Sequence, residues 1–146
     1  MKALIQRVNR ARVIVEEELI AQTARGLLVF LGVSKSDGID EVEEIIDTLL
    51  HLRILADDEG KMNHSIIQQG GDILVVPEFT LYADCSSGRR PSFGKAGGYQ
   101  HAQGVYRRLV ENLSERSPGK VESGKFGAHM KVELENDGPV TLMIET

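Results

Sequence analysis

The 146 residues of the chain are 41% hydrophobic and 27% charged, and the formal net charge is -5 at pH 7. This length is typical of one domain with a true core, so we expect a single domain spanning residues 1–146. The composition excludes a disordered or fibrous protein, and no apolar run approaches the roughly 18 residues of a membrane span. The negative charge argues against broad nucleic-acid binding and against a DNA partner, although a local basic face remains compatible with RNA.

Cysteine and histidine usage bears on compartment and metal binding. The only cysteine, Cys85, cannot form an internal disulfide, and the four histidines lack the spacing of zinc motifs. The first eight residues alternate between apolar and polar and do not resemble a secretory signal. We therefore expect a cytoplasmic protein that uses neither a metal nor an organic cofactor.

The amino-terminal half predicts several strands and one helix. Short strands are expected at residues 3–8, 12–15 and 19–21, and the apolar run at 26–33 predicts a central strand buried on both faces. From about residue 40 to residue 53, apolar side chains recur at helical spacing. Asp40 with Glu43 resembles a capping box at the start of this helix.

The carboxyl-terminal half predicts two strands, a loop, a second helix and a hairpin. The strands are expected at residues 73–76 and 78–82, and the helix from about Tyr99 to Arg116. Residues 84–98 form a long irregular loop, which is more often functional than idle. Alternation at 130–134 and 140–144 around a turn at 136–139 indicates a hairpin. The fold class is α+β, a compact single-domain β/α/β arrangement with two main helices against largely antiparallel strands.

Common catalytic motifs do not identify the function. The chain lacks a G-x-S-x-G elbow, a P-loop and a G-x-G-x-x-G turn. The turn at 136–139 contains Pro139, which has no backbone donor and is compatible with a cis peptide bond. As a turn alone, this segment does not indicate a chemistry.

Six segments taken together are more informative, namely residues 5–8, 60–63, 79–84, 88–93, 126–130 and 136–141. In this order and at these spacings, they resemble the D-aminoacyl-tRNA deacylase family over nearly the whole chain. The resemblance implies a homodimer that hydrolyses the ester of D-aminoacyl-tRNA and of mischarged glycyl-tRNA, and that rejects L-aminoacyl-tRNA.

The resemblance also implies roles for individual residues. In the family, a Gly-Pro pair with a cis bond reaches into the active site of the partner subunit, and this pair corresponds to Gly138-Pro139. Arg7 matches an arginine that holds the Gly-Pro turn, although it also suits a polar position on an edge strand. The remaining site residues implied are Phe79 and Thr80, whose backbone N–H groups form an oxyanion hole, and Met130, which contacts substrate.

One segment departs from the family pattern. Where the family has S-Q-x-T, this chain has Pro77-Glu78-Phe79-Thr80. An inward-facing Glu78 would oppose developing negative charge, so we expect its side chain to point away. Thr80 is expected to position its loop and not to act as a nucleophile, because no adjacent base is visible in the sequence. The departure leaves an alternative, a non-catalytic dimeric module that binds tRNA ends or D-amino acids.

Three basic residues lie in the long loop. Arg89, Arg90 and Lys95 are candidate tRNA phosphate contacts, flanked by Gly88 and Pro91. The alternative is that they are ordinary surface charges or that they hold the loop through carboxylates such as Asp84.

Overall fold

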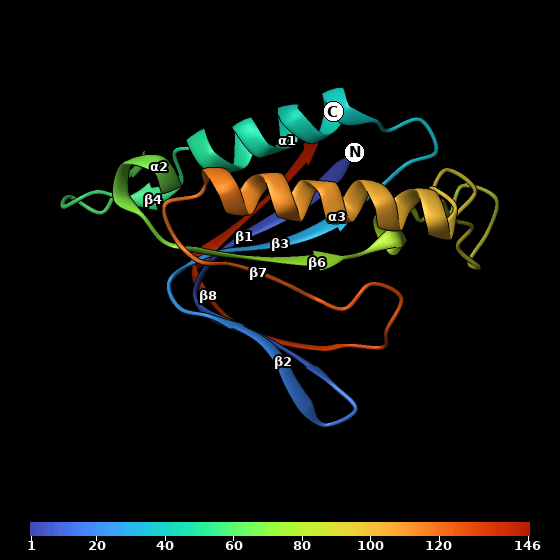
Figure 1. Cartoon of the computed structure of the whole chain (residues 1–146), viewed down its shortest axis with the longest axis horizontal. Helices are drawn as coiled ribbons and strands as arrows, with labels where there is room; N and C mark the ends of the chain where they lie inside the picture. Colours follow the sequence, from blue (N-terminus) through green and yellow to red (C-terminus); the bar gives the residue numbers. More distant parts are fainter.

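The computed structural model describes residues 1–146 and contains one mixed sheet with two long helices on one face (Figure 1). The expected α+β class with two main helices is confirmed. No helix is long and apolar enough to cross a membrane. The main elements are β1 (Lys2–Val15), β2 (Glu18–Thr23), β3 (Gly26–Gly32), α1 (Ile39–His51), β6 (Asp72–Pro77), α3 (Tyr99–Arg116), β7 (Val121–Ser123) and β8 (Lys131–Glu145). Four small elements are β4 (Leu55–Ala56), β5 (Met62–His64), α2 (Ile66–Gln69) and the 3-10 helix η1 (Phe79–Tyr82).

The long strand β1 organises the sheet. One edge of β1 pairs first with β3 and then, after residue 8, with β2, and its other edge pairs with β8 along most of its length. These three pairings are antiparallel, whereas β3, β6 and β7 run parallel to one another. The order β2-β1-β3-β6-β7 places β3 near the centre, as its apolar sequence predicts.

Two hydrophobic clusters lie on opposite faces of the sheet. The larger cluster joins α1 and α3 to the inward side chains of β1, β3 and β6. The smaller cluster lies where β2 and the adjoining half of β1 fold across the other face, below the helices in Figure 1. The buried stripe of α1 is the predicted one, namely Val42, Ile45, Ile46, Leu49 and Leu50.

The capping box expected at Asp40 and Glu43 is wrong. The helix begins two residues earlier, where the Gly38 N–H donates to the Glu41 carboxylate at 2.7 Å. The chain turns there because the buried Asp37 carboxylate accepts from the Ser34 N–H at 2.7 Å. Glu43 instead pairs with Arg116 of α3 at 2.8 Å and ties the two helices together.

Two expected strands at the amino terminus are one continuous strand, and the expected strand at 78–82 is wrong. Residues 3–8 and 12–15 belong to the single strand β1, whose polar residues Asn9 and Arg10 face solvent. After Pro77 the chain enters the 3-10 helix η1, because the Glu78 carboxylate caps the Thr80 N–H. A capped turn replaces a strand there.

The expected carboxyl-terminal hairpin is also wrong. Residues 131–136 and 141–145 both pair with β1, so the chain continues in one direction and β8 is a single interrupted strand. Apolar and polar residues alternate before and after a hairpin turn, and they alternate in the same way before and after a bulge. The two structures differ only in the strand with which the flanking residues pair. Residues 136–140 are therefore a bulge in β8.

Candidate functional site

The bulge in β8 presents Gly138 and Pro139. Register with β1 shifts on both sides of Val8, which releases the intervening residues of β8 from the ladder. The Gly138-Pro139 peptide bond is cis, as the resemblance implies. Gly138 has φ of +152°, and a Cβ atom there would lie 2.6 Å from the Val140 nitrogen. Only glycine fits this position.

The side chain of Asn136 closes the bulge from within. Its Oδ1 accepts from the Val140 N–H at 2.9 Å, and its Nδ2 donates to the Val140 carbonyl at 3.0 Å. The amide thus pairs with Val140 as a strand backbone would. Residues 137–139 are left free of the ladder, with their ends fixed.

Arg7 anchors the bulge from β1. Its Nε donates to the Asp137 carbonyl at 3.0 Å and pairs with the Asp137 carboxylate at 3.1 Å. Its Nη1 donates to the Ile54 carbonyl at 2.7 Å, and the side chain is only 10% exposed. The planar guanidinium therefore connects the residue before Gly138 to the chain that follows α1.

A cavity of about 560 Å³ lies at the carboxyl ends of β3 and β6. Its wall is mostly apolar and includes Phe79 and Met130, two residues implied by the resemblance. The start of α3 and the segment before β8 complete it. The other lining residues are Leu31, Val33, Val76, Pro77, Glu78, Gly97, Tyr99, Ala102, Phe126, Gly127, Ala128, His129 and Val132.

Aromatic pairs shape this cavity. Phe79 is 59% exposed and meets Phe93 edge-on at 5.0 Å between ring centroids. Phe126 packs between Tyr99 at 5.3 Å and Tyr106 at 5.6 Å. Burial raises the pKa of Tyr106, which stays neutral and donates to the Val75 carbonyl at 2.8 Å. The exposed Phe79 ring offers a flat apolar surface at the cavity wall.

Glu78 does not point away, so that expectation is wrong. Its carboxylate accepts from the Thr80 N–H at 3.3 Å and from the Thr80 hydroxyl. The residue is held in place because its own N–H donates to the Leu31 carbonyl at 2.8 Å. One of the two N–H groups expected in the oxyanion hole therefore already has an anionic acceptor.

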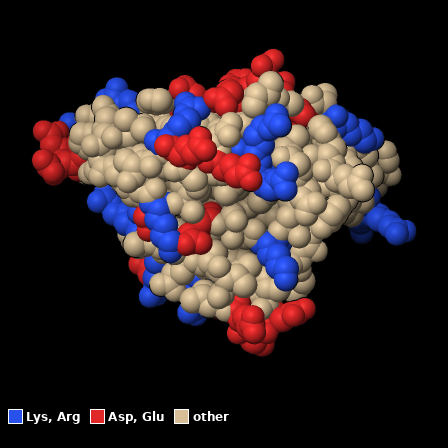
Figure 2. Space-filling view, viewed as in Figure 1, with Lys and Arg blue, Asp and Glu red and all other residues tan.

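The loop at 84–98 carries its basic side chains in solvent. Arg89, Arg90 and Lys95 are exposed and form no ion pair. The Ser86 N–H donates to Asp84 at 2.9 Å and lowers the pKa of that carboxyl, so Asp84 holds the loop without the arginines. Elsewhere on the face in Figure 2, acidic and basic groups are interspersed.

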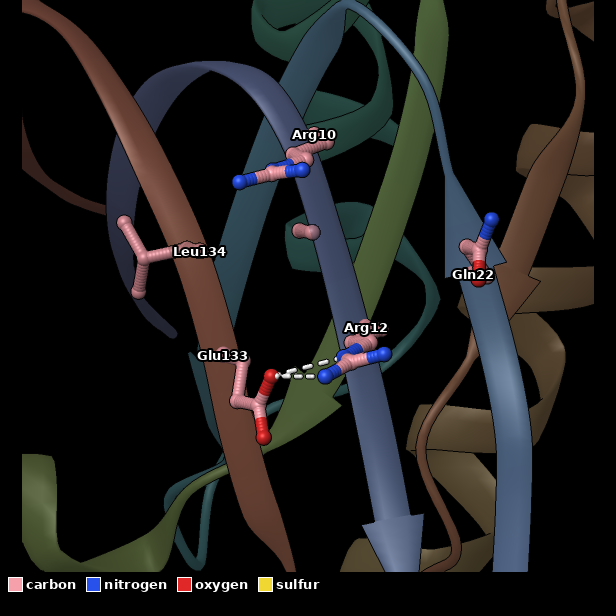
Figure 3. Close-up of a pocket in the computed structure, with 6 residues that line it drawn as sticks. Arg10, Arg12, Gln22, Glu133 and Leu134 are labelled. Carbon is pink, nitrogen blue, oxygen red and sulfur yellow. Dashed lines mark hydrogen bonds and ion pairs between the residues drawn. The ribbon is translucent and has the colours of Figure 1, made fainter.

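A second hollow of about 320 Å³ lies across β1, β2 and β8 and is lined by Arg10, Arg12 and Gln22, with Arg12 pointing toward Glu133 (Figure 3). Its charges are already paired: Arg12 reaches Glu133 at 2.5 Å, and Arg10 reaches Glu135 at 3.2 Å. These cross-strand pairs neutralise the hollow, which therefore holds no free cation for an anionic ligand.

The structure brings some of the expected residues together and separates others. Phe79 and Met130 share the cavity, and Thr80 adjoins it through Glu78. Gly138, Pro139 and Arg7 do not line that cavity within one chain. The site residues expected from the sequence did not include Tyr99, Phe126 and His129. The available signals were the glycines at 97 and 98 for Tyr99 and the segment 126–130, which resembles the family, for the other two. No group of three or more His, Cys, Asp or Glu residues is placed to hold a metal ion.

The fold and site define a class of protein already represented among solved structures. A c-Myc DNA unwinding element binding protein is similar at a TM-score of 0.94 and 38% identity, covering 100% of this chain and 99% of that chain. A probable eukaryotic D-amino acid tRNA deacylase shares the fold at a TM-score of 0.78, with 19% identity and 98% and 97% coverage.

The family follows from the sequence comparisons. The family model described as D-Tyr-tRNA(Tyr) deacylase matches residues 4–145. D-aminoacyl-tRNA deacylases of Thermotoga petrophila and Thermosipho melanesiensis are 49% and 47% identical, each over 100% of this chain and 97% of the relative. The chain therefore belongs to the D-aminoacyl-tRNA deacylase family, whose members are carboxylic ester hydrolases.

The contacts of Arg7 predict an unequal effect of two conservative substitutions. Arg7→Lys should lower the free energy of unfolding by about 1–3 kcal/mol, because the single ammonium of a lysine cannot donate to the Asp137 and Ile54 carbonyls at the same time, as the planar guanidinium does. Arg12→Lys, at an exposed pair, should cost less than about 1 kcal/mol. Urea unfolding of both variants measures the difference. Equal losses would show that Arg7 is not the anchor of the bulge.

Proposed function

We propose that this protein hydrolyses the ester bond of D-aminoacyl-tRNA and releases free amino acid and tRNA. Water adds to the ester carbonyl carbon, the bond to the ribose oxygen breaks, and that oxygen takes a proton. The proposal rests on the full-length similarity to deacylases together with an apolar cavity of about 560 Å³ beside Phe79 and Thr80. The cavity has the size of a small-molecule site, which suits an aminoacyl ester.

Selection against L esters is proposed to come from the partner subunit. In a homodimer, the Gly138-Pro139 carbonyls of one subunit enter the other subunit's cavity, contact the substrate amino group and leave no room for an L side chain. Two observations support this: the pair lies outside its own cavity, and Arg7 with Asn136 holds the bulge at both ends. A filter of main-chain atoms cannot reject a substrate without a side chain, so mischarged glycyl-tRNA is also a proposed substrate.

Catalysis is proposed to use backbone donors and the substrate itself. The N–H groups of Phe79 and Thr80 bind the developing oxyanion, and Met130 of the cavity wall contacts the substrate. The terminal 2′-hydroxyl of the tRNA assists the attacking water, which suits a cavity with few ionisable side chains. For Thr80 to take part, the oxyanion must replace the Glu78 carboxylate at its N–H.

RNA binding is proposed for the loop at 84–98. Arg89, Arg90 and Lys95 are exposed and unpaired, so phosphate binding requires no ion pair to break. Phe93 of the same loop contacts Phe79 at the cavity, which connects the basic loop to the ester site. The tRNA substrate and the lone exposed Cys85 support a cytoplasmic location.

The direct test compares matched D- and L-aminoacyl-tRNA. We expect hydrolysis of the D ester, slow or absent hydrolysis of the L ester, and hydrolysis of glycyl-tRNA, because only the L side chain meets the Gly-Pro carbonyls. Release of labelled amino acid measures all three. Protection of the D ester without hydrolysis would instead support a non-catalytic module that binds tRNA ends or D-amino acids.

Light scattering of the same preparation should give twice the 16.1 kDa of one chain. A monomer with full activity and full chiral selection would contradict the cross-subunit filter.

Thr80→Ala separates a backbone role from a nucleophile. The Glu78 carboxylate accepts the Thr80 hydroxyl, so the structure supplies the adjacent base that the sequence did not reveal. A carboxylate is nevertheless a weak base for a hydroxyl, and the N–H survives the substitution. We expect kcat/KM within about tenfold of wild type, whereas loss of an oxyanion donor would cost about 10²–10³. A larger loss of kcat/KM in a folded variant would instead support the Thr80 hydroxyl as the nucleophile.

Arg89→Gln with Arg90→Gln tests the RNA contacts. The double variant should bind tRNA more weakly and reduce the slope of log K against log salt by roughly 1.4 at most, since each phosphate contact contributes about 0.7. The ratio of D to L hydrolysis should stay the same, because chirality is judged at the ester. An unchanged slope would show that these arginines do not contact phosphate and have a structural role in the loop. A changed ratio would show that the loop helps to shape the ester site.

A further inference from the structure

Glu78 is unusual among the residues that line the main cavity. It is the only carboxylate there, and no lysine or arginine lines the cavity or pairs with it. The other ionisable residues of the wall are Tyr99 and His129. An apolar cavity with one unpaired anion attracts a ligand that carries a positive charge.

The position of Glu78 is fixed by the fold. Its N–H donates to the Leu31 carbonyl at 2.8 Å, and its side chain is half-buried beside the exposed Phe79. One carboxylate oxygen, Oε1, accepts both donors of Thr80, and Oε2 has no hydrogen-bond partner. The carboxylate therefore retains an acceptor for a ligand in the cavity.

We infer that Glu78 binds the α-ammonium of the aminoacyl ester and, in doing so, releases the Thr80 N–H for the oxyanion. The inference rests on the proposed function, which supplies the ester as the cavity's ligand. An ammonium has three donors and no acceptor, so it can bind a carboxylate together with main-chain carbonyls. A hydrogen bond between two charged groups is stronger than one to a neutral N–H, so the carboxylate turns from Thr80 towards the ammonium and binds it with both oxygens.

This arrangement ties recognition to catalysis. Without a cationic substrate, the carboxylate occupies an N–H that catalysis needs. With the substrate ammonium bound, the negative charge next to the developing oxyanion is neutralised and the N–H becomes free. Glu78 is thus a specificity-determining residue for esters with a charged α-amino group.

The experiment compares D-phenylalanyl-tRNA with D-phenyllactyl-tRNA, in which a neutral hydroxyl replaces the ammonium. At pH 6.5 the amino group is charged, because the ordinary pKa of an α-amino group is about 7.7–8.0. In Glu78→Gln, the ratio of kcat/KM for the amino ester to kcat/KM for the hydroxy ester should fall by about 10- to 100-fold. In Glu78→Ala, hydrolysis of the hydroxy ester should rise above wild type, because no carboxylate blocks the Thr80 N–H.

The matched control is Glu44→Gln, which removes the same charge from an exposed position on α1 and should keep the wild-type ratio. An unchanged ratio in both Glu78 variants, or an equal loss with the two esters, would overturn the inference. Failure of the wild-type protein to hydrolyse D-phenylalanyl-tRNA would instead overturn the proposed function itself.

Discussion

The pairing of β1 with β8 on both sides of a bulge is the constraint on which the site depends. Residues 131–136 and 141–145 are each tied to β1, so the segment between them can neither extend nor fold away. Asn136 completes the pairing within the bulge, and Arg7 fixes it to the chain after α1. Main-chain atoms at Gly138 and Pro139 are thereby presented on a rigid strand, and no side-chain substitution can alter their chemistry directly.

The cavity depends on the other half of the sheet. Parallel strands β3 and β6 end together, and the residues that follow them meet the start of α3 at one edge. Polar and aromatic groups collect there because the strand ends leave backbone and side chains free of the ladder. The Gly138-Pro139 bulge and the cavity thus belong to different parts of one chain, which is the reason that a second subunit enters the proposed mechanism.

The distribution of charge places unpaired cations and paired cations on different parts of the molecule. The exposed arginines of the 84–98 loop have no carboxylate partners, whereas Arg10 and Arg12 on the opposite part of the sheet are neutralised by Glu135 and Glu133. Within the cavity the single carboxylate of Glu78 opposes an anion and favours a cation. The proposed RNA contacts at the loop and the proposed ammonium site at Glu78 are therefore compatible with a net negative charge.

Local patterns in the sequence predicted the two long helices, because the apolar stripes of α1 and α3 follow from helical spacing, whereas the short α2 and η1 were not predicted. The apolar run of β3 likewise predicted a buried central strand. Tertiary structure decided whether residues 136–140 were a hairpin turn or a bulge, because the alternation of side chains is identical in both and only pairing with β1 separates them. It also decided the orientation of Glu78, because a carboxylate two residues before an N–H either caps it or faces solvent according to the direction of the chain after Pro77.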